Sequence, residues 1–485
     1  MDKEIDIIIK KIKEGNKNSC DIYNKIININ NHKVGIVFLE SVSNDDKISN
    51  FLGKSLSIDV RSKKTLFNNL FESLQNTIPN SKVKVINNYN DIYYHLFSGF
   101  TCIFVDGINK CIAVETKAKL DRSITESSTE PVLKGPKDSF NENFLSNIGL
   151  IRKRIKDKNL IFEEIKIGRR TKTKVAIGYI DDIADNKKVQ KIKNQLENID
   201  IDGIIDSNYI RELLYQNHVS LLPRVISTER PDLTSMSLLN GKIIIMVENT
   251  PQVLIYPGVL SDFFISPEDN YLKPINSSFT RLLRYLAFFI AILMPAFYVA
   301  LTTYNMEVIP NQLLISFAIQ KEGVPFPTII EVLILIIAYE ILREADTRKP
   351  QIIGASISIV GALILGEAAV SAGIISPIVV IIISISAVAG MTFNDPDVIN
   401  AIRFWRIIFM LSSALFGLIG LVITGIIFIA RLCSYYSLDT PYLAPIAPFY
   451  LNDLKTSLLR LSQKKVKNRS LYLNNKNITR LDEEK

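Results

Sequence analysis

The chain divides into a charged half and an apolar half, and this division constrains its fold more than any other feature. From Met1 to Arg284, charged residues break every apolar run before it reaches the length of a bilayer span. After Tyr285 the sequence is largely apolar up to Ala430. A helix needs about 20 mostly apolar residues to cross the hydrocarbon core of a membrane. The sequence therefore predicts an integral membrane protein with a large soluble region that ends near Ser278.

Five apolar segments are candidates for membrane crossings. The second and the fourth are shorter than about 20 residues, so we expect them to tilt, to thin the bilayer or to re-enter it. The five segments are Tyr285–Tyr304, Phe326–Leu342, Ile352–Ile374, Ile378–Phe393 and Ile407–Ala430.

Basic residues next to these segments predict their orientation, because Lys and Arg concentrate on the cytosolic side of membrane proteins. Arg281 and Arg284 precede the first segment and Arg343 follows the second, so both connections should be cytosolic. Five crossings would leave the basic tail LLRLSQKKVKNR on the opposite side. The Pro-rich stretch Cys433–Tyr450 would reverse this if it re-entered the membrane beside protein or water. The side of the tail stays open at this point.

The soluble region reads as α/β in two subdomains, separated by a polar, turn-rich linker from Asp121 to Pro136. The predicted domains are 1–125 and 126–278 for the two α/β subdomains, 279–451 for a polytopic helical transmembrane domain, and 452–485 for a basic cytosolic tail. Periodicity predicts strands at Lys33–Leu39, Thr173–Ile180 and the short Asp202–Ile205, and helices at Tyr89–Phe97, Asn186–Asn198 and Tyr209–Gln216.

Two hairpins are indicated by their turn residues. Asp106-Gly107 is a strong signal for a two-residue loop, which would place Cys102 directly opposite Cys111. In a reducing cytosol we expect these to remain packed thiols. A second hairpin is expected across residues 248–251, where Asn249 tolerates a positive φ.

A helix with an apolar stripe is predicted from Phe140 to Ile155. Ser139 and Glu142 fit a capping box at its start. Arg152 and its basic neighbours lie mostly off the stripe, which favours a solvated basic face over a contact with lipid or a partner.

Several function classes find no support in the sequence. It contains neither a GxGxxG nor a GxxxxGK[ST] motif, and its four Cys and three His form no metal-binding pattern. No nucleophile elbow or paired catalytic carboxylates occur. We therefore predict no enzyme activity, no cofactor and no metal site. The net charge of +8 is better explained by contact with anionic membrane lipids than by nucleic acid, since no nucleic-acid-binding motif is present.

Acidic residues inside the apolar segments are the strongest candidates for function, because an unpaired carboxylate in hydrocarbon is costly. Glu340 is close enough to Arg343 on one helical face for a structural ion pair. Glu331 is expected at the outer headgroup level. Glu367 lies among small residues that allow either close helix packing or a narrow polar path. The candidate pore-lining residues are Ser356, Ser358, Glu367 and Ser371.

Several phrases along the chain resemble one known family in order. They are GPKDSFNENFLSNIGLIRKRIK, TERPDL, FFISPEDNY, RLLRYLAFFIAILMPAFYVALTTYNMEVIP, EGVPFP, EILREAD, SIVGALILGEAAVSAGIISP and PYLAPIAPF. Between about Asp106 and Arg460 the sequence resembles the A subunits of GerA-type spore germinant receptors. The phrase PAFYVALTTY favours such a subunit over the related accessory protein of the dipicolinic-acid release apparatus.

The resemblance implies a protein of the spore inner membrane with its N-terminal region on the cytosolic side, in the spore core. It implies a transporter-like B subunit and a lipoprotein C subunit as partners, and a homo-oligomeric ion channel that opens when germinant is sensed. A non-conducting scaffold that transmits the signal is the alternative. Residues for coupling or structural support are then Glu229, Arg230, Pro231, Asp232, Glu340 and Arg343.

Overall fold

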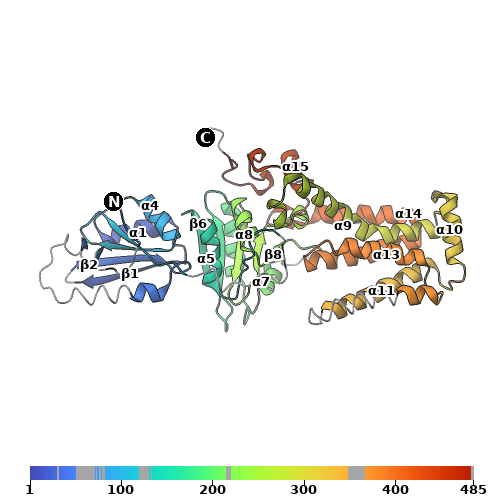
Figure 1. Cartoon of the computed structure of the whole chain (residues 1–485), viewed down its shortest axis with the longest axis horizontal. Helices are drawn as coiled ribbons and strands as arrows, with labels where there is room; N and C mark the ends of the chain where they lie inside the picture. The colour runs from blue at the N-terminus through green and yellow to red at the C-terminus, as the bar shows by residue number, and fades with distance from the viewer. Residues whose placement is uncertain are drawn as a thin grey trace.

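The computed structural model describes residues 1–29, 32–50, 71–72, 74–75, 78, 82–118, 130, 132, 134–214, 220–347 and 366–481. Two sheet units and a helical domain follow one another along the chain (Figure 1). We call residues 1–118 the first sheet unit, 134–272 the second sheet unit and 274–434 the helical domain. The predicted fold class, an α/β region of two parts followed by apolar helices, is confirmed.

The first sheet unit is an antiparallel sheet covered on both faces, with Ile48, Phe71 and Leu74 packed on the face opposite α1 and α4. α1 and α4 pack their apolar side chains, among them Ile8, Ile12 and Leu96, against inward-facing residues of the strands. The sheet order is β1-β2-β4-β5-β3. The elements are α1 (Ile5–Gly15), β1 (Ile22–Ile29), β2 (His32–Leu39), β3 (Val83–Ile86), α4 (Tyr89–Phe97), β4 (Phe100–Val105) and β5 (Cys111–Glu115).

The second sheet unit is covered on both faces. In β9 the alternation of side chains sends Ile243 and Ile245 toward α6 and α7, and Ile244 toward α5 and α8. The sheet order is β6-β7-β9-β10-β8. The elements are α5 (Phe144–Arg154), β6 (Leu160–Ile167), β7 (Thr173–Ile180), α6 (Asn186–Glu197), α7 (Ser207–Leu214), β8 (Ile226–Thr228), α8 (Pro231–Leu239), β9 (Ile243–Val247) and β10 (Val253–Tyr256).

The two sheet units share one topology. If the strands of each unit are counted from its start, both sheets have the order 1-2-4-5-3, and every neighbouring pair is antiparallel. A helix precedes the first strand in both units, and another lies between the third and fourth strands. The soluble region is thus a tandem pair of similar folds, which the sequence pattern did not reveal.

Several local predictions are confirmed and others are corrected. β7 and α4 have the predicted bounds, while Asp202–Ile205 forms no strand. The loop at Asp106-Gly107 is longer than two residues, because Phe104 pairs with Cys111 and Cys102 pairs with Ala113. The two cysteines are therefore not directly opposite, although both are buried free thiols.

Asn residues occupy a turn and a helix start among these local structures. Asn249 has the expected positive φ, at 66°, in the turn between β9 and β10. The N-cap of α5 is Asn143, which accepts a hydrogen bond from the Ser146 amide at 2.9 Å. The predicted capping box at Ser139 is therefore replaced by a later helix start.

Arg152 is buried in an ion pair, whereas the sequence predicted that it would be exposed to solvent. Its side chain is fully buried, and its Nη2 lies 2.9 Å from Oδ1 of Asp21, which is also fully buried. The guanidinium donates further to Leu160 O and Ser19 Oγ. Asp21 and Ser19 belong to the first sheet unit, so this ion pair joins the two units. The predicted solvated face is wrong for Arg152, because a tertiary partner 131 residues away compensates its burial.

Within the part of the helical domain that the structure describes, two helices are long and apolar enough to cross a membrane, Pro274–Thr303 and Pro396–Ser434. A shorter apolar helix, α13, lies between them in sequence. Figure 1 shows α10 at the end of the domain farthest from the sheets. The elements are α9 (Pro274–Thr303), α10 (Asn311–Lys321), α11 (Thr328–Thr347), α13 (Pro377–Gly390) and α14 (Pro396–Ser434).

α14 is a helical hairpin, folded back at Gly417. Gly417 has non-helical angles, with φ of 64° and ψ of −142°. The ring centroids of Trp405 and Phe428 lie 4.7 Å apart, whereas 23 residues of straight helix would separate them by roughly 35 Å. Asn305, from the loop after α9, accepts the amide hydrogen bond of Leu418 and so satisfies the broken turn. A side chain at position 417 would collide with Asn305 and Tyr304.

The hairpin returns the chain to the second sheet unit. The Pro-rich segment packs there: Leu260 donates its amide to Tyr442 O at 2.9 Å, and Ser437 Oγ donates to Arg224 O at 2.6 Å. This contact with the sheet differs from the predicted re-entrant path. The C-terminal tail continues over the same unit, where Lys188 Nζ donates to Leu473 O (Figure 1). Its elements include β11 (Tyr436–Ser437), β12 (Thr440–Pro441) and α15 (Leu451–Leu458).

The Asp21–Arg152 pair makes stability depend on pH. Burial raises the pKa of Asp21, but the charge of Arg152 and the hydrogen bonds from Arg152, Ser19 and Ser41 outweigh it, so the pKa is lowered overall. A lowered pKa stabilises the fold above the unfolded-state value of about 3.9. That contribution should be lost as the pH falls through the still lower pKa of the folded state.

Replacing Arg152 by Met should lower the free energy of unfolding of the sheet units by about 3–5 kcal/mol, because Asp21 would stay buried without its counter-charge. Denaturant titration of the full-length protein in detergent, followed by circular dichroism, measures this loss. The matched control is Arg169→Met, which removes a pair with Asp200 in which the side chains are 65% and 71% exposed and should change stability little. Equal losses in both variants would contradict the role given to burial.

Candidate functional site

A buried carboxylate joins the second sheet unit to the first turns of α9. Asp269 is completely buried, and its Oδ2 lies 2.7 Å from Arg281 Nε and 2.9 Å from Arg284 Nη1. Arg281 also donates to Thr456 O in α15. One acidic side chain therefore gathers the end of the second sheet unit, α9 and the C-terminal tail.

The predicted Arg230 and Asp232 form a second buried pair in the same region. Their side chains are 2% and 4% exposed, with Arg230 Nη2 2.7 Å from Asp232 Oδ2. The Tyr271 hydroxyl donates to the same carboxylate at 2.7 Å. Burial, followed by this hydrogen bond, raises the pKa of Tyr271. Tyr271 stands two residues after Asp269. The short segment that contains both residues therefore contacts the Arg230–Asp232 pair through Tyr271 and the two arginines of α9 through Asp269.

The neighbouring candidates act through the backbone. Pro231 begins α8, as its fixed φ favours. The carbonyl of Glu229 accepts the amide hydrogen bond of Phe140 at 2.8 Å, which ties the segment before α5 to α8. Arg230 additionally donates to the carbonyls of Glu130 and Pro136. Burial raises the pKa of Glu130 to about 7.

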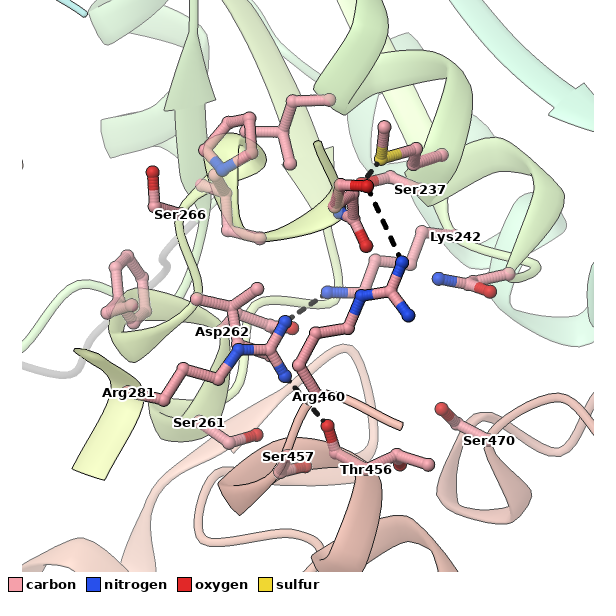
Figure 2. A pocket seen from close by; sticks show the side chains of 18 of the residues that line it. Ser237, Lys242, Ser261, Asp262, Ser266, Arg281, Thr456, Ser457, Arg460 and Ser470 are labelled. Carbon is pink, nitrogen blue, oxygen red and sulfur yellow. Dashed lines mark hydrogen bonds and ion pairs between the residues drawn. The ribbon is translucent and has the colours of Figure 1, made fainter. Parts of the chain in front are cut away.

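A cavity of about 480 Å³ opens at this junction. Its walls come from the second sheet unit, the first turns of α9, residues 392–395 before α14, and the tail. Figure 2 shows Arg281, Asp262 and Lys242 on its inner side, with Thr456 and Ser457 of α15 below and Arg460 reaching into it. Sequence analysis did not single out this cavity, because its lining residues are spread along the chain from Glu130 to Arg480.

A third cluster lies inside the helical domain. Glu340 of α11 contacts Arg343 at 3.6 Å, as predicted. It is also 2.8 Å from Arg406 and 2.5 Å from Arg403, both in α14. Arg406 is 3% exposed. The predicted local pair is thus part of a larger network that links α11 to α14.

Glu331 caps the start of another helix. It is fully buried, and its Oε2 accepts hydrogen bonds from the amide and the hydroxyl of Ser376, at 2.8 and 2.7 Å. Ser376 is the N-cap of α13, where backbone amides favour a negative charge. Oε2 is therefore satisfied by the start of α13, while Oε1 lies 3.8 Å from Lys321 Nζ.

The structure describes two of the four candidate pore-lining residues. Glu367 and Ser371 are exposed on the surface of the helical domain, in a helical stretch at 366–371. Ser356 and Ser358 lie outside the described residues. Within the described ranges, no group of three or more His, Cys, Asp or Glu side chains is arranged to hold a metal ion.

With the geometry in place, comparison with known sequences decides the family. The model of the Bacillus/Clostridium GerA spore germination protein matches residues 10–472. The chain belongs to the GerA family. The match extends well beyond the range from Asp106 to Arg460 over which the motifs suggested it.

Curated relatives agree with this assignment. Spore germination protein KA of Bacillus subtilis is 38% identical over 458 residues, which cover 94% of this chain and 81% of that protein. Spore germination protein A1 of the same organism is 31% identical over 476 residues, covering 98% and 96%. GerLA of Bacillus cereus is 33% identical over 448 residues, covering 92% and 90%.

This GerA-family chain is also similar to a solved structure. It is the N-terminal domain of the A subunit of the Bacillus megaterium spore germinant receptor GerK3, at 32% sequence identity and a TM-score of 0.42. The match covers 53% of this chain and 95% of that domain.

Asp269→Asn tests the junction. The change would leave Arg281 and Arg284 without their shared carboxylate, so we expect the junction to lose about 3–5 kcal/mol and the connection around residues 264–274 to become sensitive to protease. Limited proteolysis and thermal unfolding of the full-length protein measure both effects. Glu268→Gln is the matched control, since Glu268 forms no ion pair within the described part of the chain. If both variants behaved like the parent protein, Asp269 would not hold the junction.

Proposed function

We propose that this GerA-family chain is the A subunit of a nutrient germinant receptor and that several copies form an ion-conducting path through the spore inner membrane. The exposure of Glu367 and Ser371 on the helical domain carries the proposal. Exposing a carboxylate to lipid costs free energy. Acidic residues in membrane segments therefore normally face water or another protein surface. Contact between copies would place these residues along a polar path, which is how rings of acidic side chains select cations.

The proposed orientation puts both sheet units and the tail on the cytosolic side. α9 starts at the second sheet unit and α14 ends there, so the helical domain would cross the membrane an even number of times. Arg281, Arg284 and Arg403 lie near this end of the helices, as expected for the cytosolic side. The turn at Gly417 would divide the fifth apolar segment into two crossings, which would bring the tail back to the cytosolic side.

The proposed partners follow from the family. A transporter-like B subunit and a lipoprotein C subunit would complete the receptor, and germinant bound largely by the B subunit would open the path. The charge clusters around Arg230, Asp269 and Glu340 are proposed to couple the sheet units to the helices, because each joins elements from different parts of the chain.

Cysteine labelling tests the orientation. With a membrane-impermeant maleimide applied from outside to protoplasts that express the chain, Glu322→Cys should react, because position 322 lies in the exposed loop after α10. Lys464→Cys, in the exposed tail, should react only after the membrane is permeabilised. Labelling of position 464 in intact protoplasts would support five crossings and contradict the even number.

Conduction is tested with the assembled receptor in liposomes. Germinant should start a flux of monovalent cations, and Glu367→Gln should reduce this flux or change its selectivity, because the carboxylate would lose its charge. Glu322→Gln, a matched change in the loop outside the helices, should leave the flux unchanged. No cation flux under any germinant, together with normal germination of spores carrying Glu367→Gln, would instead favour a non-conducting scaffold.

A further inference from the structure

The tail wall of the junction cavity carries unneutralised positive charge. Arg460, Arg469 and Arg480 line it, and none of them forms an ion pair with a residue that the structure describes. Arg460 Nε is buried without any hydrogen-bond acceptor in the described ranges. Its Nη1 donates to the carbonyl of the next residue, and its Nη2 makes a long contact of 3.5 Å with Asn270 O.

Positive charges around Arg460 outweigh the one negative charge that acts on it. Burial lowers its pKa first, and Arg281 and Arg480 lower it further, while Asp269 has the smallest effect and the opposite sign. Asp269 is already shared between Arg281 and Arg284, so a single negative charge faces three guanidinium groups. A folded protein has no internal reason to hold these groups together, because like charges at short range destabilise it.

Most acids of the cavity wall are engaged elsewhere. Asp262 pairs with Lys242 at 2.6 Å. Asp395 accepts amide hydrogen bonds at the start of α14, and Asp453 accepts the Leu471 amide at 2.8 Å. None of these three acids forms an ion pair with Arg460. Hydroxyl groups also line the cavity, as Figure 2 shows for Ser237 and Ser470, while the hydroxyls of Thr456 and Ser457 already donate to Asp453 O.

We propose that this cavity binds a phosphate group, held by Arg460 with Arg480 and the surrounding hydroxyls. Guanidinium forks match the oxygens of a phosphate, and several donors from different directions suit its tetrahedral shape. The volume of about 480 Å³ accommodates a phosphate with a substituent. The site goes beyond the proposed conduction path, since Glu367 and Ser371 do not line it.

The position of the cavity is consistent with two sources of phosphate. On α9, Phe279 and Leu282 are 64% and 46% exposed beside the Arg281 turn, as expected for side chains at the membrane surface. The phosphate of an anionic phospholipid would reach the cavity from there. A free phosphate would enter from the cytosol. Either would bridge the tail, the second sheet unit and α9, and so stabilise the junction.

The test uses the full-length protein in nanodiscs of phosphatidylcholine, with inorganic phosphate as the first probe and chloride at equal ionic strength as the reference. A second set of nanodiscs contains phosphatidylglycerol. Thermal unfolding reports binding by stabilisation, and native mass spectrometry reports retained lipid. The variants are Arg460→Gln and Arg480→Gln, and the control is Arg170→Gln, an 84% exposed arginine on the second sheet unit.

Three results are distinguishable. Saturable stabilisation by inorganic phosphate, weakened on the order of tenfold or more by Arg460→Gln and not by Arg170→Gln, supports the site with free phosphate as ligand. Stabilisation only by phosphatidylglycerol, with lipid retained by the parent protein and lost from Arg460→Gln, supports it with a lipid headgroup. No saturable effect of either probe, or equal effects in all variants, overturns the proposal.

The Arg480→Gln variant shows whether a loss of binding in Arg460→Gln could come from misfolding. Its side chain is exposed, so the change should leave the fold intact while weakening phosphate or lipid binding in the same direction as Arg460→Gln. Binding that is normal in Arg480→Gln but absent from an unfolded Arg460→Gln would also count against the proposal. These readouts do not depend on ion flux, so they remain informative if the conduction proposal fails.

Discussion

The carboxylate of Asp269 binds two arginines of α9, and the position of the helical domain relative to the second sheet unit depends on these contacts. An isolated carboxylate could not remain charged in a fully buried position. Arg281 and Arg284 compensate it, and Arg281 then holds α15 through the carbonyl of Thr456. The end of the sheet region, the start of the helices and the C-terminal tail are therefore fixed by one set of charges.

The same principle recurs at the other joints of the molecule. Asp21 and Arg152 join the two sheet units, and Glu340 joins α11 to α14 through Arg406. Buried ion pairs contribute little net stability, because desolvation offsets most of the attraction, but breaking one is costly. Such pairs therefore favour one docking geometry over others. In the proposed receptor subunit, this specificity would matter more than their net contribution to stability.

Two features of the fold explain how so long a chain is arranged. The soluble region repeats one antiparallel topology, so each unit has its own core and the Asp21–Arg152 pair can join them as preformed bodies. Gly417 divides the last apolar segment into two antiparallel helices. Without that turn the tail could not reach Lys188 and Arg224 of the second sheet unit.

The amino-acid sequence by itself determined what depends on neighbouring residues. The boundary between polar and apolar halves, the bounds of β7 and α4, the helix start at Pro231 and the positive φ of Asn249 all follow from local chemistry. The contact between Glu340 and Arg343 was predictable for the same reason, since both lie on one helical face. The order of the family motifs, which spans most of the chain, indicated the family.

Only the tertiary structure decided which distant charges meet. Arg152 read as a solvated residue because Asp21 lies 131 positions away. Arg403 and Arg406 gave no sign of pairing with Glu340, and Asp269 gave none of its role at the junction. Gly417 resembled the other glycines of an apolar segment until Asn305 was seen to satisfy the broken helix. The physical reason is the same in each case: periodicity records which face a side chain takes, whereas the partner that makes a buried charge or a broken helix tolerable is supplied by another part of the fold.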